Sequence, residues 1–299
     1  MKREKVIVLG SVAFDYIMGF EENFVNAISI DHAKKEFQST VTANSRTQHF
    51  GGTAGNIAYN LGLLNVSPVS LFGSVGKDFE SLGYSKHIAK FKNIELKVDI
   101  KDDLFTAACY IVNDVKSNQM IVFHGGALDE SKSIDLRKKL KNPELYAYAI
   151  NSTQSIEAMI NFSEQLSELN IPTIFDPGQI TPLFSKDDIL SILTKSVILI
   201  GNNHEINQVL SKIGMSEEDL LGIVSTVVKT KGSEGSELIT KTASGSLERI
   251  EIPISSPDKV IDTTGAGDGY RAGLLSGLIL KMSLKNACRL GSTVGSFVV

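Results

Sequence analysis

The segment from Asp262 to Gly269 has the composition of an anion-binding turn, because glycines alternate in it with small and acidic residues. It follows a short apolar pair and leads into an apolar pattern with helical spacing. Glycines just before a helix let several backbone N–H groups point outward together, and the helix dipole favours a phosphate or an oxyanion there. The candidate anion site therefore consists of Gly265, Ala266 and Gly267.

Asp268 lies in the first turn of this expected helix, and two interpretations of it stay open. An acidic residue at that position complements the helix dipole and needs no further explanation. A carboxylate beside a phosphate-binding turn can also take the proton of an attacking hydroxyl, which contributes roughly 10²–10⁴ in rate.

Four further groups of polar residues follow expected strands, where open α/β sheets bind ligands. Each also has an ordinary interpretation: a solvated loop acid, a loop-to-helix turn, a helix-start acid or a glycine turn. Glutamate at a strand end can hold Mg²⁺ through water, and asparagine offers both a donor and an acceptor. The candidates are Asp15, the glycine pair Gly51 and Gly52 with Asn56, the pair Asn202 and Glu205, and the turn containing Thr230, Gly232 and Gly235.

Several other chemistries are excluded by spacing. The glycines after Thr264 read G-x-G-x-G, and no acidic residue follows Asp268, so a dinucleotide fingerprint is absent. A Walker A loop and the hydrolase nucleophile elbow are absent too. Gln208 stands where the zinc motif beginning at His204 needs its second histidine.

Composition places the chain among ordinary globular proteins. It has 299 residues, 42% of them hydrophobic and 21% charged, with a net charge of −4. That balance provides no basic surface for nucleic acid or an anionic membrane, and no stretch approaches the roughly 20 apolar residues of a membrane span. Two cysteines are too few for a disulfide scaffold. We expect a soluble protein of the reducing cytoplasm.

The elements that must position these residues alternate along the chain. Apolar runs separated by helical patterns predict a parallel sheet covered by helices on both faces. The expected strands are 6–9, 69–72, 146–150, 172–175, 197–200 and 223–228, and the expected helices are 55–64, 79–91, 155–169, 205–213 and 267–281.

Two regions break this alternation, at about 16–50 and 98–124. The second contains two alternating runs around Asp114–Asn118, the pattern of a hairpin. We interpret both regions as a small β-rich lid inserted into a single domain of residues 1–299; two ordinary surface loops are the alternative.

In this order, the motifs GSVAFD, FGGTAGN, VGKDF, GNNHE, TKGSEG and DTTGAGD resemble the ribokinase (PfkB) family of carbohydrate and nucleoside kinases. The resemblance covers essentially the whole chain. It implies a three-layer αβα Rossmann-like core with a β-lid, and transfer of the γ-phosphoryl group of ATP to a CH₂OH hydroxyl.

The resemblance also implies roles for individual residues. Asp268 matches the catalytic base, and Gly265, Ala266 and Gly267 match the anion hole. Asp15, Gly51, Gly52 and Asn56 match the groups that hold sugar hydroxyls. Asn202 and Glu205 match the motif that organises Mg²⁺ and phosphate. Thr230, Gly232 and Gly235 match nucleotide contacts, and Asp262 and Thr264 match a K⁺-type cation loop of some members.

Within the family, GSVAFDYI and GGTAGNIAYNLGLL look most like bacterial and archaeal nucleoside kinases, adenosine kinase included. Thr53 stands where ribokinases usually carry lysine, which counts against a pure ribose pocket. Relatives usually continue beyond Val299, so part of the adenine and cation site is expected outside these residues. We expect a nucleoside such as adenosine as acceptor; a free sugar is the alternative, and a non-catalytic nucleotide-binding protein a remote one.

The lid carries two more expectations. A nucleoside needs an apolar slot for its base, and Phe14, Phe105, Ala107 and Ile121 lie in segments that should border it. An exposed lid edge can also pair with a second copy of the chain, which predicts a homodimer.

Overall fold

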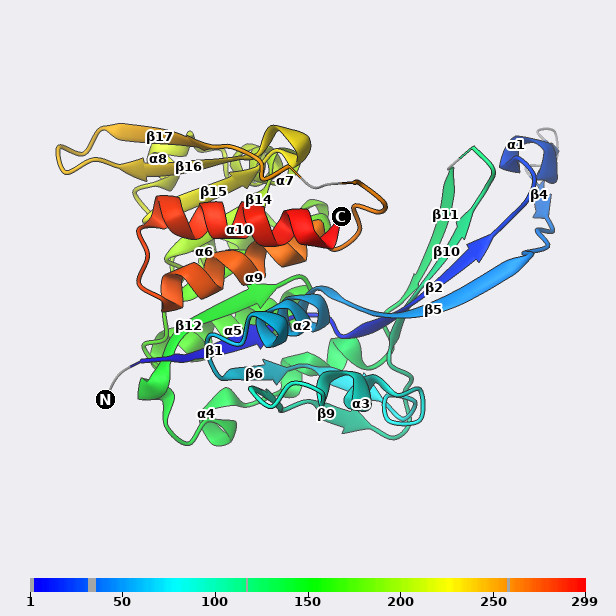
Figure 1. Cartoon of the computed structure of the whole chain (residues 1–299), viewed down its shortest axis with the longest axis horizontal. Helices are drawn as coiled ribbons and strands as arrows, with labels where there is room; N and C mark the ends of the chain where they lie inside the picture. Colours follow the sequence, from blue (N-terminus) through cyan, green and yellow to red (C-terminus); the bar gives the residue numbers. More distant parts are fainter. Residues whose placement is uncertain (1–2, 32–35, 117, 257–258) are drawn as a thin grey trace.

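The computed structural model describes residues 3–31, 36–116, 118–256 and 259–299. These residues form a three-layer core, from which a second, twisted sheet projects to one side (Figure 1). None of the described helices is long and apolar enough to cross a membrane.

The core of the described chain is a nine-stranded sheet. Seven neighbouring strands are parallel, as the uninterrupted apolar runs predict, and the two strands at one edge are antiparallel. In spatial order the strands are β17 (Leu247–Ile252), β16 (Ser236–Lys241), β15 (Thr226–Thr230), β14 (Ile198–Asn202), β13 (Thr173–Asp176), β12 (Tyr146–Ser152), β1 (Lys5–Leu9), β6 (Val69–Phe72) and β8 (Ile94–Leu96).

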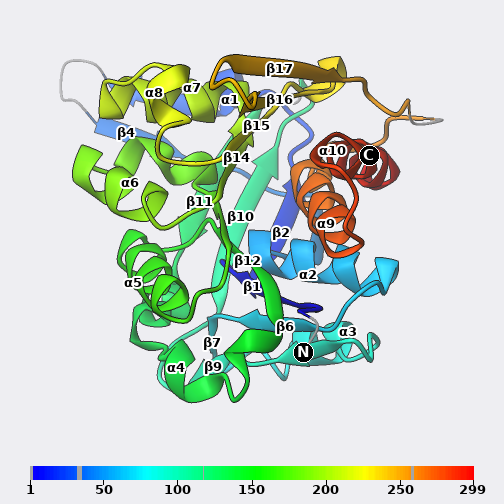
Figure 2. The same cartoon turned by 90° about the vertical axis from the view of Figure 1, so that its left-hand side faces the viewer.

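Helices cover both faces of this sheet (Figure 2). Side chains alternate along a strand, so Val6 and Val8 of β1 join one core cluster while Ile7 and Leu9 join another on the opposite face. The first face is covered by α2 (Thr53–Leu64), α9 (Ala266–Ile279) and α10 (Leu284–Val298), and the other by α4 (Leu136–Lys139), α5 (Ile156–Glu168), α6 (Lys186–Leu193), α7 (Asn203–Ile213) and α8 (Glu217–Leu220).

The projecting sheet unites the two regions that break the sequence pattern. Its order is β11 (Gln119–His124), β10 (Ala107–Asn113), β2 (Ala13–Gly19) and β5 (Ser45–Gly51), and β10 and β11 form the hairpin expected around Asp114. Shorter pieces accompany it: α1 (Phe24–Ala27), β3 (Ile28–Asp31), β4 (Glu36–Ser39), β7 (Ser74–Gly76) and β9 (Asp99–Lys101).

The sheet joins α2 at Gly52, where the chain turns sharply. Gly52 has φ 85 and ψ 142, a conformation open to glycine and few other residues. A Cβ atom there would lie 2.5 Å from the Ser11 carbonyl oxygen. The glycine therefore lets the first turn of α2 approach the segment that links β1 to β2.

The long helix expected over 79–91 is wrong. Only α3 (Tyr84–Ile88) is helical, and turns occupy the residues from Asp78 to Gly83. Gly83 adopts a left-handed conformation with φ 85, which interrupts a regular helix before Tyr84. Asp78 instead accepts a hydrogen bond from the Thr106 backbone N–H at 2.7 Å, a contact between distant segments that helical spacing does not report.

Candidate active site

Asp268 lies in the first turn of α9, the helix that follows the DTTGAGD turn. Gly265 caps α9 in the left-handed conformation, with φ 81, and the Ala266 N–H donates to the Thr263 carbonyl at 3.2 Å. The N–H groups of Gly267 and Asp268 have no backbone acceptor among the described residues. The structure therefore leaves two donors at the positive end of α9 for an anion, although the predicted donor Ala266 is used within the turn itself.

A second helix start faces the first. Asn56, in the first turn of α2, donates from Nδ2 to Oδ2 of Asp268 at 2.8 Å. The next turn supports it, because Asn60 Nδ2 donates to the Asn56 carbonyl at 2.9 Å. The structure thus brings together two motifs separated by about two hundred residues, and it directs the Asp268 carboxylate into the space between α2 and α9.

Burial raises the pKa of the Asp268 carboxyl to about 7. The Arg271 guanidinium and the Asn56 hydrogen bond lower that pKa, and the nearby carboxylates of Asp176 and Asp15 raise it. A group that titrates near neutral pH can accept a proton and release it again, which suits a general base.

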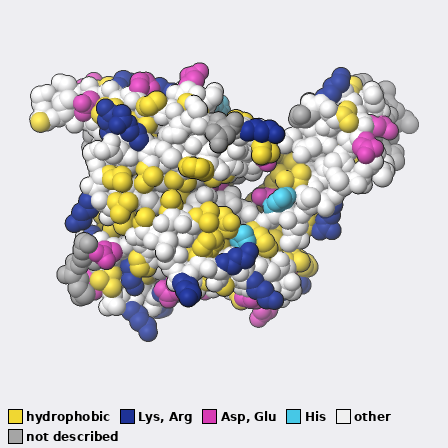
Figure 3. Space-filling model, in the orientation of Figure 1, with side chains coloured by type: hydrophobic (Ala, Val, Ile, Leu, Met, Phe, Trp, Pro, Cys, Tyr) yellow, Lys and Arg dark blue, Asp and Glu magenta, His cyan; other side chains and the backbone are white. Residues whose placement is uncertain are grey.

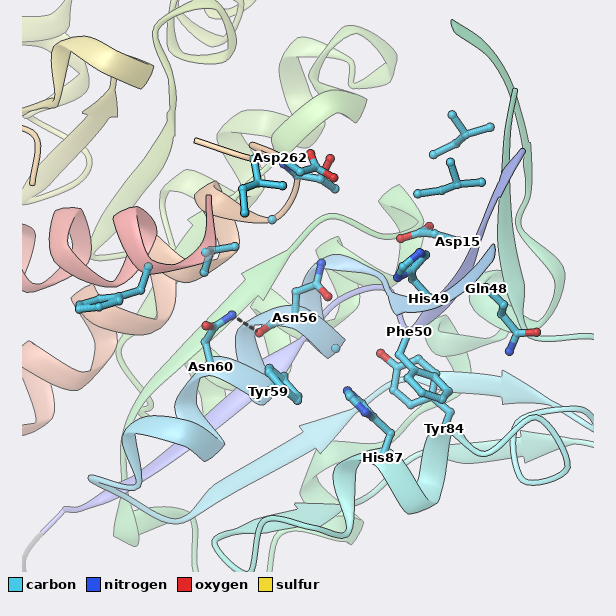
Figure 4. A pocket seen from close by; sticks show the side chains of 18 of the residues that line it. Asp15, Gln48, His49, Phe50, Asn56, Tyr59, Asn60, Tyr84, His87 and Asp262 are labelled. Atoms are coloured by element: carbon cyan, nitrogen blue, oxygen red, sulfur yellow. Dashed lines mark hydrogen bonds between the residues drawn. The ribbon is translucent and has the colours of Figure 1, made fainter. Parts of the chain in front are cut away.

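Asp15 approaches the same space from the projecting sheet. It lies in β2 beside His49 of β5, and both side chains point into the cavity between the sheet and the core (Figure 4). Burial raises the pKa of the Asp15 carboxyl, and His49 opposes that rise. Gly51 makes room for this side chain, because a Cβ atom there would lie 2.0 Å from Oδ2 of Asp15.

The cavity that Asp15 borders has a volume of about 1240 Å³. Figure 3 shows it as an open notch between core and sheet, with hydrophobic side chains at its border. The sheet contributes Ile17 and Ile111, and the core contributes Ile261, Phe297 and Val298. The cavity therefore has a polar end at Asp15 and Asn56 and apolar walls farther out.

Two smaller cavities are lined by the candidate phosphate and nucleotide residues. One of about 230 Å³ is lined by Thr53, Asn202, Glu205, Thr230, Gly265, Gly267 and Asp268, among others. Another of about 600 Å³ is lined by Asn202, Thr230 and Gly232 with neighbouring residues. Most of the residues that sequence reasoning selected for phosphate and nucleotide thus lie around one continuous region.

Gly235 is the exception among the predicted nucleotide contacts. It lines neither of these cavities. Its φ is 87, and a Cβ atom would lie 2.2 Å from the Ile252 carbonyl oxygen, so the close approach of β17 explains the glycine.

Glu205 and the loop at Asp262 differ as candidate cation sites. Glu205 caps α7 by accepting from the Asn202 N–H at 2.7 Å, and it lines the 230 Å³ cavity together with Asp176 and Asp268. Burial raises the pKa of its carboxyl. Oxygen donors around a phosphate-sized space fit Mg²⁺, which typically uses one or two carboxylates with substrate phosphates.

Asp262 is exposed and accepts the Thr264 N–H at 2.9 Å. Both residues border the larger cavity and not the 230 Å³ one. Among the described residues, no three acidic, histidine or cysteine side chains lie close enough together to hold a metal ion by themselves.

The apolar border differs from the one expected. Phe14 is buried in the core, Ala107 is buried against Ala13 and Leu128, and Phe105 lies under Lys77, whose Nζ is 4.3 Å from the ring centroid. Ile121 is exposed beside Ile111. None of these four residues lines the large cavity, because strand alternation and the twist of the sheet decide which side chains face it.

Sequence reasoning missed an ion pair next to Asp268. Arg271 of α9 and Asp176 at the end of β13 are both buried, and both line the 230 Å³ cavity. Asp176 follows a parallel strand, so the rule that selected Asp15 could have found it. Arg271 is the single charged residue in the apolar stretch after Asp268, a signal that points to a buried partner.

A comparison with family models matches this chain over residues 3–299 to the pfkB family of carbohydrate kinases. The chain belongs to this family. The assignment agrees with the motifs, with the parallel core and with the helix start at Asp268.

Related proteins and solved structures support the assignment to the pfkB family. The chain is 31% identical to a nucleoside kinase of Methanocaldococcus jannaschii over the whole chain and 91% of that protein. A crystal structure of the M. jannaschii nucleoside kinase, an archaeal member of the ribokinase family, has a TM-score of 0.87 and covers 100% of this chain and 92% of the other.

A nucleoside kinase of Burkholderia thailandensis in complex with inosine is 28% identical, with a TM-score of 0.78 over 97% of this chain and 89% of the other. Arabidopsis thaliana ribokinase with ribose and ATP has the same fold at 20% identity, with a TM-score of 0.78 over 99% of this chain and 92% of that one.

The environment of Asp268 predicts a measurable effect on stability. The pKa of Asp268 is raised in the folded state, so the unfolded state loses this proton at a lower pH than the folded state does. The free energy of unfolding therefore decreases as pH rises from about 4 to about 7. Asp268→Asn removes that penalty and keeps an acceptor for Asn56. We expect the variant to be more stable at pH 8 by about 2 kcal/mol, less than the full shift implies because the residue is partly exposed.

Urea denaturation of both proteins at pH 4 and pH 8 measures this difference, which should vanish at pH 4. Asp219→Asn is the opposite control: hydrogen bonds from Ser216 lower the pKa of the exposed Asp219 carboxyl, so that variant should lose stability at pH 8. Equal stability of wild type and Asp268→Asn at pH 8 would show that the Asp268 carboxylate is not disfavoured in the fold.

Proposed function

We propose that this protein is an ATP-dependent nucleoside kinase, which transfers the γ-phosphoryl group of ATP to the CH₂OH hydroxyl of the ribose. The observation that carries the proposal is the position of Asp268. Its carboxylate lies in the first turn of α9, where two backbone N–H groups have no backbone acceptor in the described part of the chain. It lines the phosphate-sized cavity and accepts a hydrogen bond from Asn56, which lines the large cavity together with Asp15.

The chemical step follows from that arrangement. The acceptor hydroxyl attacks the γ-phosphorus, its proton passes to Asp268, and the bond to the leaving oxygen of ADP breaks. The Gly267 and Asp268 N–H groups stabilise the charge on the transferred phosphoryl group. Asn56 holds the carboxylate in place through its 2.8 Å hydrogen bond. Positioning therefore supplies most of the catalysis.

We assign ATP to the region bordered by Asn202, Thr230 and Gly232, with its phosphates toward Gly265 and Gly267. Mg²⁺, held by Glu205 through water, would neutralise part of the phosphate charge in a cavity that already contains three carboxylates. A K⁺-type ion at Asp262 and Thr264 has weaker support, because the Asp262 carboxylate is exposed and already accepts a backbone N–H.

The large cavity favours a nucleoside over a free sugar. Asp15 and Asn56 can bond to ribose hydroxyls, and a carboxylate acceptor strengthens such bonds. Ile261 and Phe297 are 81% and 85% exposed at the border of the cavity. A nucleobase between these side chains and Ile17 and Ile111 would cover apolar surface that a pentose cannot reach. Two relatives named as nucleoside kinases point the same way.

Thr53 also distinguishes the sugar end of the site. Its hydroxyl donates to the Thr153 carbonyl at 3.1 Å and bonds to the Ser152 hydroxyl at 3.1 Å. A neutral side chain that is occupied in this way supplies no cation to the acceptor. Phosphorylation of a free sugar remains the alternative, because the family that the chain matches is described as one of carbohydrate kinases.

The projecting sheet, formed by β2, β5, β10 and β11, is proposed to act as the lid that the sequence predicts at about 16–50 and 98–124 of a single domain. Its closure over the acceptor would bring Ile17 and Ile111 toward Ile261 and exclude water that would otherwise hydrolyse ATP. We place the enzyme in the cytoplasm, which agrees with its two free cysteines, Cys109 and Cys288.

The first test concerns the base. Asp268→Asn should lower kcat at least ~10²-fold and leave the KM for ATP nearly unchanged, because the proton acceptor is lost and the binding surface is kept. In the wild type, kcat/KM should rise with pH and level off above about 7, where the Asp268 carboxyl is ionised. Asp219→Asn, far from the cavity, is the control. Turnover near the wild-type value in Asp268→Asn would reduce this residue to a helix-capping role.

The second test concerns the acceptor. With ATP and Mg²⁺, kcat/KM for adenosine or another nucleoside should exceed that for ribose or fructose at least ~10-fold. Ile111→Ala should lower kcat/KM for the nucleoside and spare the residual activity on ribose, whereas Val115→Ala, at the exposed tip of the same hairpin, should change neither. A preference for the free sugar would reject the nucleoside assignment and keep the kinase. A protein that shows no ATP turnover with any acceptor tested would match a non-catalytic nucleotide-binding protein.

A third test concerns assembly, for which we propose a homodimer formed through the lid. The edge strand β11 exposes three successive apolar residues, Ile121, Val122 and Phe123. Such an edge is suited to pairing with a second copy. Sedimentation should give a dimer for the wild type and a monomer for Val122→Lys. A monomeric wild type at micromolar concentration would contradict the proposal.

A further inference from the structure

A buried ion pair lies directly behind the start of α9. Arg271 is 7% exposed and Asp176 is 1% exposed. The arginine donates from Nε to Oδ2 and from Nη2 to Oδ1 of Asp176, both at 2.5 Å, so the two planar groups form a bidentate pair. The third nitrogen, Nη1, donates to the Gly267 carbonyl at 3.0 Å. One guanidinium thus connects the end of β13 to the first turn of α9.

The hydrogen bond from Arg271 to the Gly267 carbonyl affects one of the two candidate anion-binding N–H groups. The Gly267 carbonyl and the Asp268 N–H belong to one peptide group, and in a trans peptide they point in opposite directions. When Arg271 donates to the carbonyl, the Asp268 N–H is directed away from it, toward the N-terminal end of α9 where the phosphoryl group would lie. A hydrogen bond to the carbonyl also polarises the peptide and strengthens its N–H as a donor.

The charge of Arg271 acts on the same residue. Asp15 from β2 and Asp176 from β13 place negative charge near Asp268, Asn56 from α2 donates to it, and the uncharged Tyr84 hydroxyl of α3 lies nearby. Glu205 of α7 adds negative charge on the side of Arg271. Arg271 is the cation among these named groups, so it offsets several carboxylates that would otherwise favour a protonated Asp268.

Fold stability alone gives little reason for such a pair. Replacing a buried ion pair by apolar residues of similar volume is often neutral or stabilising, because both charges must be desolvated. The surrounding residues of α9 are apolar and buried, and they already hold the helix against α10 and the sheet. A pair kept at the border of the 230 Å³ cavity, three residues after Asp268, therefore points to a role in the reaction.

We propose that Arg271, held in place by Asp176, is a positioning residue for phosphoryl transfer: it orients the Gly267–Asp268 peptide toward the phosphoryl group and supplies the positive charge that keeps the Asp268 carboxylate ionised. This inference rests on the proposed kinase activity. It predicts that Arg271 acts on kcat through Asp268 and its N–H group, and contributes little to the binding of ATP or of the acceptor.

Two substitutions at Arg271 separate the two parts of this role. Arg271→Met removes both the bidentate guanidinium contact and the positive charge. We therefore expect kcat to fall at least ~10²-fold and the acid limb of the pH profile to move to higher pH. Arg271→Lys keeps the positive charge but loses the bidentate contact, so kcat should fall at least ~10-fold while the acid limb of the pH profile stays in place. In both variants the KM values for ATP and nucleoside should stay within ~3-fold of the wild type.

Three controls make the result decisive. Thermal melting and circular dichroism establish that each variant is folded. The double variant Asp176→Asn/Arg271→Met leaves no unpaired buried charge, and it should have the kcat of Arg271→Met alone, because the two residues act as a unit. Arg137→Met removes a guanidinium that is also paired with two carboxylates, Asp135 and Glu168, outside the site, and it should keep wild-type kinetics.

The outcomes distinguish the inference from the proposed function. A folded Arg271→Met or double variant with kcat within ~3-fold of the wild type would overturn the positioning role. So would a loss of activity that appears wholly as raised KM, which would make Arg271 a binding residue. A wild-type protein without turnover on any acceptor would instead overturn the kinase assignment itself.

Discussion

The burial of one carboxylate, that of Asp268, is the constraint on which the rest of the site depends. A carboxylate surrounded by protein resists ionisation, and here the pKa rises to about 7. The surroundings limit that rise with the Asn56 amide and the Arg271 guanidinium. Each of these groups is positioned by a different element. Asn56 lies in α2, far from Asp268 in the sequence, and Arg271 is held by Asp176 of β13. The parallel core is what brings these elements to one edge of the sheet.

The proposed acceptor site is divided between the core and the second sheet. A kinase must hold a small hydroxyl compound against a buried base and then release the product, so part of the binding surface has to be separable from the core. Here Asp15 lies in the projecting sheet, while Asn56 and Asp268 lie in the core. The glycine pair at the junction serves both needs, because Gly51 makes room for the Asp15 carboxylate and Gly52 permits the sharp turn into α2.

Much of the fold could be predicted from local pattern, and the failures share a physical cause. The strand runs at Val6, Val69 and Tyr146 and the helix after Ser155 follow from periodicity, because burial on both faces or on one stripe leaves a record in the residues themselves. The short α3 was missed because Gly83 and a contact from Asp78 to Thr106 override the helical spacing. Likewise, core packing or local contacts account for the apolar residues Phe14, Phe105 and Ala107. Hydrophobicity alone does not distinguish residues of this kind from those that line a ligand pocket.

The sequence by itself determined the family, the order of the motifs and the chemical types at the site, because glycines before a helix and acidic residues after strands have the same local consequences wherever they occur. Only the tertiary structure decided which of these residues meet. It joined Asn56 to Asp268, released the Gly267 and Asp268 N–H groups while using that of Ala266, and paired Arg271 with Asp176. Those contacts join residues far apart in the chain, and their distances and charges depend on how helices and sheets pack, which no local spacing encodes.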